Sequence, residues 1–224
     1  GPFVALQLGL ILWLAFKITS KLFPYDNSGF YASLVLASST LFFFSLVMGQ
    51  ETGLTALSLA ATVHYLVEKE TGDFSSMILA GFATALGALT REYGCAFLFC
   101  GIAVCLWRRN SWKLTSAYVI AVLILVSPWY LRTWVVAGNP FYSISSFGGI
   151  FNVNEVHCGI FKVYEEYFGF SNQPLTKLYY LLTSLLFTAP VQASIGIAAA
   201  VFHFRKHGYL AVSILAVAVL WICS

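Results

Sequence analysis

A few charged side chains interrupt or border long apolar stretches of this sequence, and they are its main candidates for chemistry. Glu51 lies between two apolar runs, Arg91 and Glu92 directly follow another, and Arg132 ends the stretch Ser-Pro-Trp-Tyr-Leu-Arg. His157 lies among acidic residues in a long polar connection. An ionisable group near bilayer depth costs free energy, so each one is treated first as a functional hypothesis.

Three of these candidates, Glu51, Arg91 and Arg132, each have a functional and a structural interpretation. Glu51 either has a functional role, in which it orients a substrate hydroxyl or supports a catalytic base, or it stabilises the positive end of the following helix. Arg91 either binds a phosphate or pairs with Glu92 or another acid. Arg132, with Arg91, has the geometry to grip a lipid phosphate in a bidentate manner, or is an interfacial anchor in a belt of aromatic residues. His157 is the one histidine that we consider worth testing.

Other reactive residue types lack the spacing that chemistry requires. Cys95, Cys100 and Cys105 recur every five residues, which turns them around a helix axis, and they form no Cys-x-x-Cys pair. His203 and His207 have metal-ligand spacing but lie in a basic turn without a carboxylate. No cofactor is evident, and a divalent metal stays open. The sequence has no glycine-rich nucleotide loop, serine nucleophile elbow or nucleic-acid signature.

The elements that position these residues are membrane helices. Hydrophobic residues make up 59% of the chain and charged residues 9%, and the mean hydropathy is +0.82. A soluble domain has about 25% charged residues, so this composition excludes one. The apolar runs are continuous and do not alternate with a period of two, which favours helices over the strands of a barrel.

We predict an all-α fold, a polytopic transmembrane helix bundle of about eight membrane helices. The apolar runs are residues 3–19, 30–49, 52–67, 75–89, 93–107, 114–134, 178–202 and 209–223. The third to fifth runs are about 22 Å long, shorter than the roughly 30 Å hydrocarbon core, so they are expected as incomplete spans inside the bundle. Residues 1–224 are expected to be one transmembrane domain and an internal fragment of a longer protein.

The basic residues are divided unevenly between the two ends of these runs. If the runs alternate in direction, Arg91, Arg132, Lys162 and Lys177 face one side, and the remaining eight lysines and arginines face the other. The positive-inside rule places the richer side in the cytoplasm. Residues 137–177 then form a non-cytoplasmic loop. Residues 155–170 within it predict an interfacial helix, which either gates a substrate or packs over the bundle mouth.

Two segments resemble integral-membrane glycosyltransferases of the GT-C fold. Residues 81–91, which end in Leu-Thr-Arg before a further apolar helix, resemble a helix end of these enzymes. Ser127-Pro-Trp-Tyr-Leu-Arg-Thr-Trp134, followed by Gly138-Asn-Pro-Phe-Tyr142, resembles their second motif. The related enzymes are family-39-type transferases, which include protein O-mannosyltransferases and the aminoarabinose transferase. Thr133 and Ser143 depart from the usual Asn and Pro.

The resemblance implies transfer of a hexose or pentose from a polyprenyl-phosphate-linked donor, with inversion, to a lipid, glycan or protein acceptor. It places the reaction on the non-cytoplasmic face of a bacterial inner membrane, in cell-envelope glycosylation. By this resemblance we expect the principal catalytic acid of the family to precede this fragment, which would leave Glu51 as an accessory acid. Arg91, Glu92, Arg132 and His157 are then substrate-binding candidates. The isolated fragment is expected to be inactive.

A multi-span transporter or lipid-carrier flippase is the alternative function. Its marker would be two related halves with charged or Gly/Pro-broken helices, and we find no internal repeat. A purely structural membrane subunit also stays open, because the catalytic acid is not identified. Membrane lipids are expected partners in every case, and nucleic acid in none.

Overall fold

The computed structural model describes residues 2–39, 50–67, 73–90, 96–108, 111–140 and 190–202, together with short helical pieces at 175–176, 178–179 and 182–183 and with residue 208. Every regular element in these residues is a helix. The all-α fold class is therefore confirmed for the part of the chain that the structure describes.

The helices follow the predicted runs closely at most positions. Their bounds are α1 (Pro2–Leu22), α2 (Ser28–Ala37), α4 (Gln50–Val67), α5 (Phe74–Thr90), α6 (Ala96–Trp107), α7 (Trp112–Ala137) and α11 (Pro190–Phe202). Of the predicted run 178–202, α11 occupies only the second half. The predicted run 209–223 and the interfacial helix at 155–170 lie outside the described residues.

The second predicted run, 30–49, is wrong as a single helix because α2 ends at Ala37. The Ser38 hydroxyl donates to the Val35 carbonyl at 2.8 Å, and the Ser39 amide donates to the Leu36 carbonyl at 3.1 Å. These bonds use carbonyls of the last turn, as tightened helix ends commonly do. Two adjacent serines thus end the helix inside a stretch that hydropathy alone reads as continuous.

Two described helices, α1 with 21 residues and α7 with 26, are long and apolar enough to cross a membrane. The other described apolar helices are shorter. At 1.5 Å per residue, the 17 residues of α5 span about 25 Å, less than the roughly 30 Å hydrocarbon core. The arrangement of about eight spans therefore stays a prediction.

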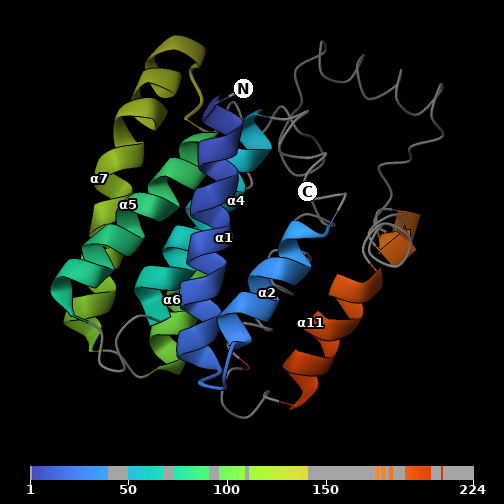
Figure 1. Ribbon diagram of the computed structural model, residues 1–224. Helices are drawn as coiled ribbons and strands as arrows, with labels where there is room; N and C mark the ends of the chain where they lie inside the picture. The colour runs from blue at the N-terminus through green and yellow to red at the C-terminus, as the bar shows by residue number, and fades with distance from the viewer. Residues whose placement is uncertain are drawn as a thin grey trace, which may run out of the picture.

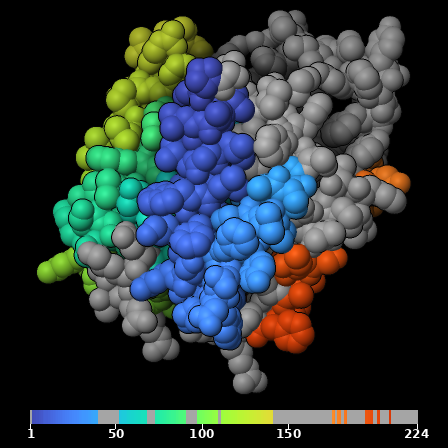
Figure 2. Space-filling view, viewed as in Figure 1, coloured from blue at the N-terminus to red at the C-terminus, as the bar shows by residue number. Residues whose placement is uncertain are grey.

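The helices contact one another in the order α2, α1, α4, α5, α7, with α6 packed against α4, α5 and α7. Figure 1 shows α5 between α4 and α7. Figure 2 shows α1 and α2 side by side on one face of the molecule. The Ser33 hydroxyl joins them by donating to the Leu12 carbonyl at 3.0 Å. α5 therefore lies at the centre of the described bundle.

The central position of α5 depends on small side chains. Its buried residues are mostly alanine, glycine, serine and threonine. A Cβ added at Gly81 would lie 2.7 Å from the Tyr118 carbonyl oxygen and 2.7 Å from the Ala121 Cβ, both in α7. Small residues permit such close approach of helix backbones, which drives helix association in membranes.

A chain of hydroxyl groups crosses the same interior. The Thr84 Oγ1 of α5 lies 3.1 Å from the Thr62 Oγ1 of α4 and 3.0 Å from the Tyr118 Oη of α7. Tyr118 also donates to the Phe97 carbonyl of α6 at 3.1 Å. All three hydroxyl residues are buried. Four helices are thereby joined through groups that would be costly to leave unpaired in an apolar interior.

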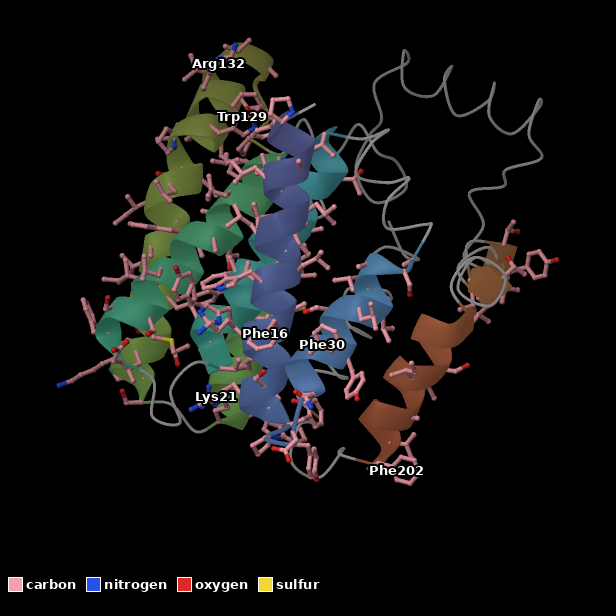
Figure 3. The ribbon with its side chains drawn as sticks, viewed as in Figure 1. Phe16, Lys21, Phe30, Trp129, Arg132 and Phe202 are labelled. Carbon is pink, nitrogen blue, oxygen red and sulfur yellow. The ribbon has the colours of Figure 1, made fainter. Side chains whose placement is uncertain are left out.

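The bundle has two ends, which we name after residues labelled in Figure 3. Lys21, in the last turn of α1, marks the Lys21 end, and Arg132, in α7, marks the Arg132 end. α7 begins at the Lys21 end, as does α5. The Arg132 end contains the first turns of α1 and α4 and the last turns of α5 and α7.

Candidate functional site

The Arg132 end gathers the helix termini on which the predicted site residues lie. Gly81 of α5 and Ala121 of α7 lie side by side where the two helices approach closely, so positions along both helices can be counted from this contact. Thr90 is nine residues beyond that contact and Arg132 eleven residues beyond it, or about 14 and 17 Å at 1.5 Å per residue. The last residue of α5 and the arginine of α7 therefore lie at the same end of the bundle, where α7 extends beyond the end of α5 (Figure 1).

The helix that supplies Arg132 continues through an internal proline. Pro128 has no amide hydrogen for the Ile124 carbonyl, and the Ser127 hydroxyl donates to that carbonyl at 3.2 Å. α7 then ends at Gly138, which has φ +70° and donates its amide to the Trp134 carbonyl at 2.9 Å. A glycine in the left-handed region is a common helix terminator.

Arg132 itself is exposed, and its guanidinium carbon lies 5.5 Å from the centre of the Trp129 ring (Figure 3). A guanidinium can contact an aromatic face and still direct its planar N–H groups toward an anion. Among the described residues, no carboxylate forms an ion pair with Arg132. This geometry suits a phosphate ligand, and it equally suits the interfacial anchor that the neighbouring exposed Trp134 indicates.

Glu51 is the second residue of α4 and lies at the Arg132 end. Its position in the first turn fits the helix-dipole interpretation. It also puts an acidic residue at the end of the bundle that carries Arg132. Both interpretations of Glu51 therefore remain.

The other predicted site residues are not described. Arg91 and Glu92 follow Thr90 in the sequence but lie outside the described residues, and so does His157 with the connection around it. The structure thus brings the backbone of Glu51 and the side chain of Arg132 to one end of the bundle. The partnership of Arg91 with either residue stays a prediction.

Basic residues of the described bundle are concentrated at the Lys21 end, and one of them has a structural role that the sequence did not suggest. Arg108, directly after α6, donates from Nη1 to the Leu66 carbonyl in the last turn of α4. An arginine at a helix C-terminus satisfies an orphan carbonyl and favours the negative end of the dipole. Lys17 lies 5.8 Å from the centre of the Trp13 ring.

Sequence reasoning also missed a buried amide. Gln7 of α1 is 1% exposed, and neither its Nε2 nor its Oε1 has a hydrogen-bond partner within the described part of the chain. A polar residue inside an apolar run was the available signal, and the same signal marks Thr62, Thr84 and Tyr118. Such residues in membrane helices usually bond to a neighbouring helix.

No cluster of three metal-ligating side chains occurs among the described residues. Cys100 and Cys105 are buried and form no disulfide within the described part of the chain. His64 packs with its ring centre 6.0 Å from that of Trp13 and 5.2 Å from that of Tyr65. These groups contribute to packing between and within helices.

An apolar helical bundle with small-residue packing and helix-end arginines is typical of an integral-membrane protein. Comparison with protein families places it more narrowly. A family model described as dolichyl-phosphate-mannose-protein mannosyltransferase matches residues 3–131, which is 129 of the 224 residues. The chain belongs to this family of GT-C-type membrane glycosyltransferases, which confirms the resemblance. No curated protein and no solved structure gives a match.

Family membership points to glycosyltransferase activity in a membrane. It implies in general a lipid-linked sugar donor and a glycan or protein acceptor. The matched residues include all of α2, α4, α5 and α6 and end one residue before Arg132.

Proposed function

We propose that this protein transfers a sugar from a polyprenyl-phosphate-linked donor to a lipid, glycan or protein acceptor at the Arg132 end of the bundle. The observation that carries the proposal is the exposed Arg132 on Trp129, on a bundle of the mannosyltransferase family, at the end where the first turn of α4 contains Glu51. An anionic leaving group and an acceptor hydroxyl require these two kinds of side chain.

In the proposed reaction the acceptor oxygen attacks the anomeric carbon of the sugar as the bond from that carbon to the phosphate oxygen breaks. The polyprenyl phosphate leaves with the bonding electrons, and its negative charge is stabilised by Arg132 and Arg91. A carboxylate accepts the acceptor's proton, and Glu51 orients that acceptor as an accessory acid. Attack from the face opposite the phosphate inverts the anomeric centre.

Glu92 and His157 are proposed as further substrate-binding residues. Glu92 is adjacent to Arg91 and has the charge to fix its guanidinium, while His157 belongs to the proposed outer loop, 137–177. A hydrogen-bonding side chain in such a loop is suited to bind a sugar hydroxyl. The loop would exclude water, so that sugar transfer competes well with hydrolysis.

The proposed sidedness follows from the distribution of charge. Lys17, Lys21, Arg108 and Lys113 lie toward the Lys21 end, and Arg132 lies at the opposite end. An excess of lysine and arginine in short connections is typical of the cytoplasmic side. The Arg132 end would then face away from the cytoplasm, in the inner membrane of a bacterium.

The test is transfer of radiolabelled sugar from membrane-extracted polyprenyl-phosphate donors by the full-length protein in liposomes. Arg132→Ala should lower kcat/KM by roughly ten- to a hundredfold, since a charge-assisted bond to a phosphate contributes about 1.5–3 kcal/mol. Arg132→Lys should recover only part of the loss, because an ammonium lacks the bidentate fork. Arg91→Ala and Glu51→Gln are measured in parallel.

The matched control is Lys21→Ala, which removes an exposed cation from the opposite end of the bundle. It should leave transfer unchanged. If Arg132→Ala retains full transfer while folded, Arg132 is an interfacial anchor and its proposed role is wrong. If the wild-type protein consumes no donor but moves the intact lipid across the liposome, the flippase alternative replaces the transferase.

A further inference from the structure

An apolar groove of about 460 Å³ runs between the first halves of α5 and α7. Its walls include Phe74, Ile78 and Phe82 of α5 and Ile120 and Ile124 of α7. The floor is formed where Ala121 approaches α5 at Gly81. In a bilayer this groove would face the hydrocarbon chains, because its lining is almost entirely apolar.

The groove has one charged end. Lys113 and Trp112, both exposed, line it at the first turn of α7, toward the Lys21 end. The positive end of the α7 dipole lies at the same place, and its N-cap Ser111 makes no side-chain capping bond. The nearby acid, Asp73, accepts a hydrogen bond from the Ser76 amide at 2.7 Å and so caps α5. Lys113 is thus the charged side chain of the groove's lining, and it lies beside the positive end of the α7 dipole.

We propose that this groove binds one acyl chain of an anionic membrane phospholipid, with the lipid phosphate on Lys113. From Lys113 to Ile124 the groove follows eleven residues of α7, or roughly 16 Å. One leaflet contributes about half of the roughly 30 Å hydrocarbon core, so a phospholipid chain would fit this length. Trp112 is at the position where tryptophan anchors a helix at the interface.

Charge and position favour a phospholipid over the lipid-linked sugar donor. The groove's cationic mouth is at the Lys21 end, whereas the proposed donor phosphate binds at the Arg132 end. A donor with its phosphate on Arg132 would bring only its tail toward this groove and leave Lys113 without an anion. A neutral lipid would use the apolar walls but gain nothing from Lys113.

The experiment measures lipid retention by the full-length protein, by native mass spectrometry after reconstitution in nanodiscs of phosphatidylglycerol and phosphatidylcholine. The wild-type protein should retain phosphatidylglycerol in preference. Lys113→Ala should lower that preference about fivefold, the effect of one lysine near an anionic surface. Lys21→Ala, which removes an exposed cation of the same end, should not.

A second pair of variants tests the chain-binding part of the groove. Ile120 is 53% exposed in the groove, and Leu123 is 52% exposed on the same helix but outside it. Ile120→Trp should fill the groove and abolish retention, while Leu123→Trp should retain the lipid. The proposal would be overturned if Lys113→Ala and Lys21→Ala lowered the preference for phosphatidylglycerol equally. It would also be overturned if the two tryptophan variants retained the lipid equally. Lys113-dependent replacement of phosphatidylglycerol by added polyprenyl phosphate would overturn it as well. None of these readouts involves sugar transfer.

Discussion

Gly81→Ala is the sharpest test of the central packing, because the added methyl group meets atoms of α7 that have little freedom to move. The new Cβ would lie 2.7 Å from the Tyr118 carbonyl oxygen and 2.7 Å from the Ala121 Cβ. Ordinary contact begins at 3.4 Å, so α5 and α7 must separate by 3.4 − 2.7, or about 0.7 Å. The backbone oxygen has no alternative rotamer that would relieve the contact.

A separation of that size has a predictable cost. A gap of 0.5–1 Å forfeits a quarter to a half of the dispersion energy of each affected contact. Overpacking of a well-packed interior typically costs about 1–3 kcal/mol. We therefore expect Gly81→Ala to lower the unfolding free energy by this amount, which changes the unfolding equilibrium about five- to a hundredfold.

The assay is unfolding of the purified protein in mixed micelles by titration with sodium dodecyl sulfate, followed by the fluorescence of its six tryptophans. Gly9→Ala is the matched control, because a Cβ at Gly9 in α1 meets nothing within 4 Å. Adding Ala121→Gly to Gly81→Ala should recover part of the loss, since it removes one of the two clashing atoms. If Gly81→Ala matches Gly9→Ala in stability, the close approach of α5 and α7 is refuted.

Three further predictions use the same unfolding assay. Tyr118→Phe removes bonds to the Thr84 hydroxyl and the Phe97 carbonyl and should cost about 1 kcal/mol, since such bonds average about 0.6 kcal/mol in membranes; unchanged stability would contradict the network. Gln7→Leu should stabilise the protein by roughly 1–3 kcal/mol by removing a buried amide without a described partner, and destabilisation would mean that the amide is bonded. Arg108→Ala frees the Leu66 carbonyl; it should lower stability by about 1 kcal/mol and make the end of α4 more sensitive to proteolysis, whereas intact protection would exclude that capping role.

The positions of α5 and α7 were predictable because their apolar runs end at clear signals. The predicted run 75–89 corresponds to α5, Phe74–Thr90. The beginning of this helix is fixed by Asp73, whose carboxylate accepts a hydrogen bond from the Ser76 amide. Gly138 fixes the end of α7. Caps and left-handed glycines act locally, so a single sequence contains them.

The packing of these helices was not predictable from the pattern of apolar residues. In lipid both the buried and the exposed face of a helix are apolar, so hydropathy does not identify the inner face. α7 illustrates this, because Ile124 is 63% exposed while nearby Val122 is 2% exposed. The inner face is instead marked by small and hydroxyl residues, such as Gly81 and Thr84, whose meaning depends on what lies opposite.

For the candidate site, too, the sequence suggests the residues but not how they are arranged in space. The sequence offers Arg132 and Glu51 as candidates because charges are conspicuous in an apolar chain, and their residue types suggest phosphate and hydroxyl chemistry. Which charges meet depends on the levels of the helix ends and on the connections between them. The relative positions of the helix ends cannot be derived from the sequence pattern, because they depend on contacts between helices such as that of Gly81 with α7.

The packing of α5 also bears on the proposed chemistry, because it sets the position of Thr90, which precedes Arg91 in the sequence. Gly81 holds α5 against α7, and Gly87 brings it close to the Phe97 ring of α6 and to Ser58 of α4. Thr84 bonds to both α4 and α7 between these contacts. A slide of α5 by one residue, about 1.5 Å, would break all of these contacts at once. The position of Thr90 relative to α7 is therefore fixed by contacts in the interior, and we expect a substitution deep in the bundle to impair the proposed phosphate binding although it changes neither arginine.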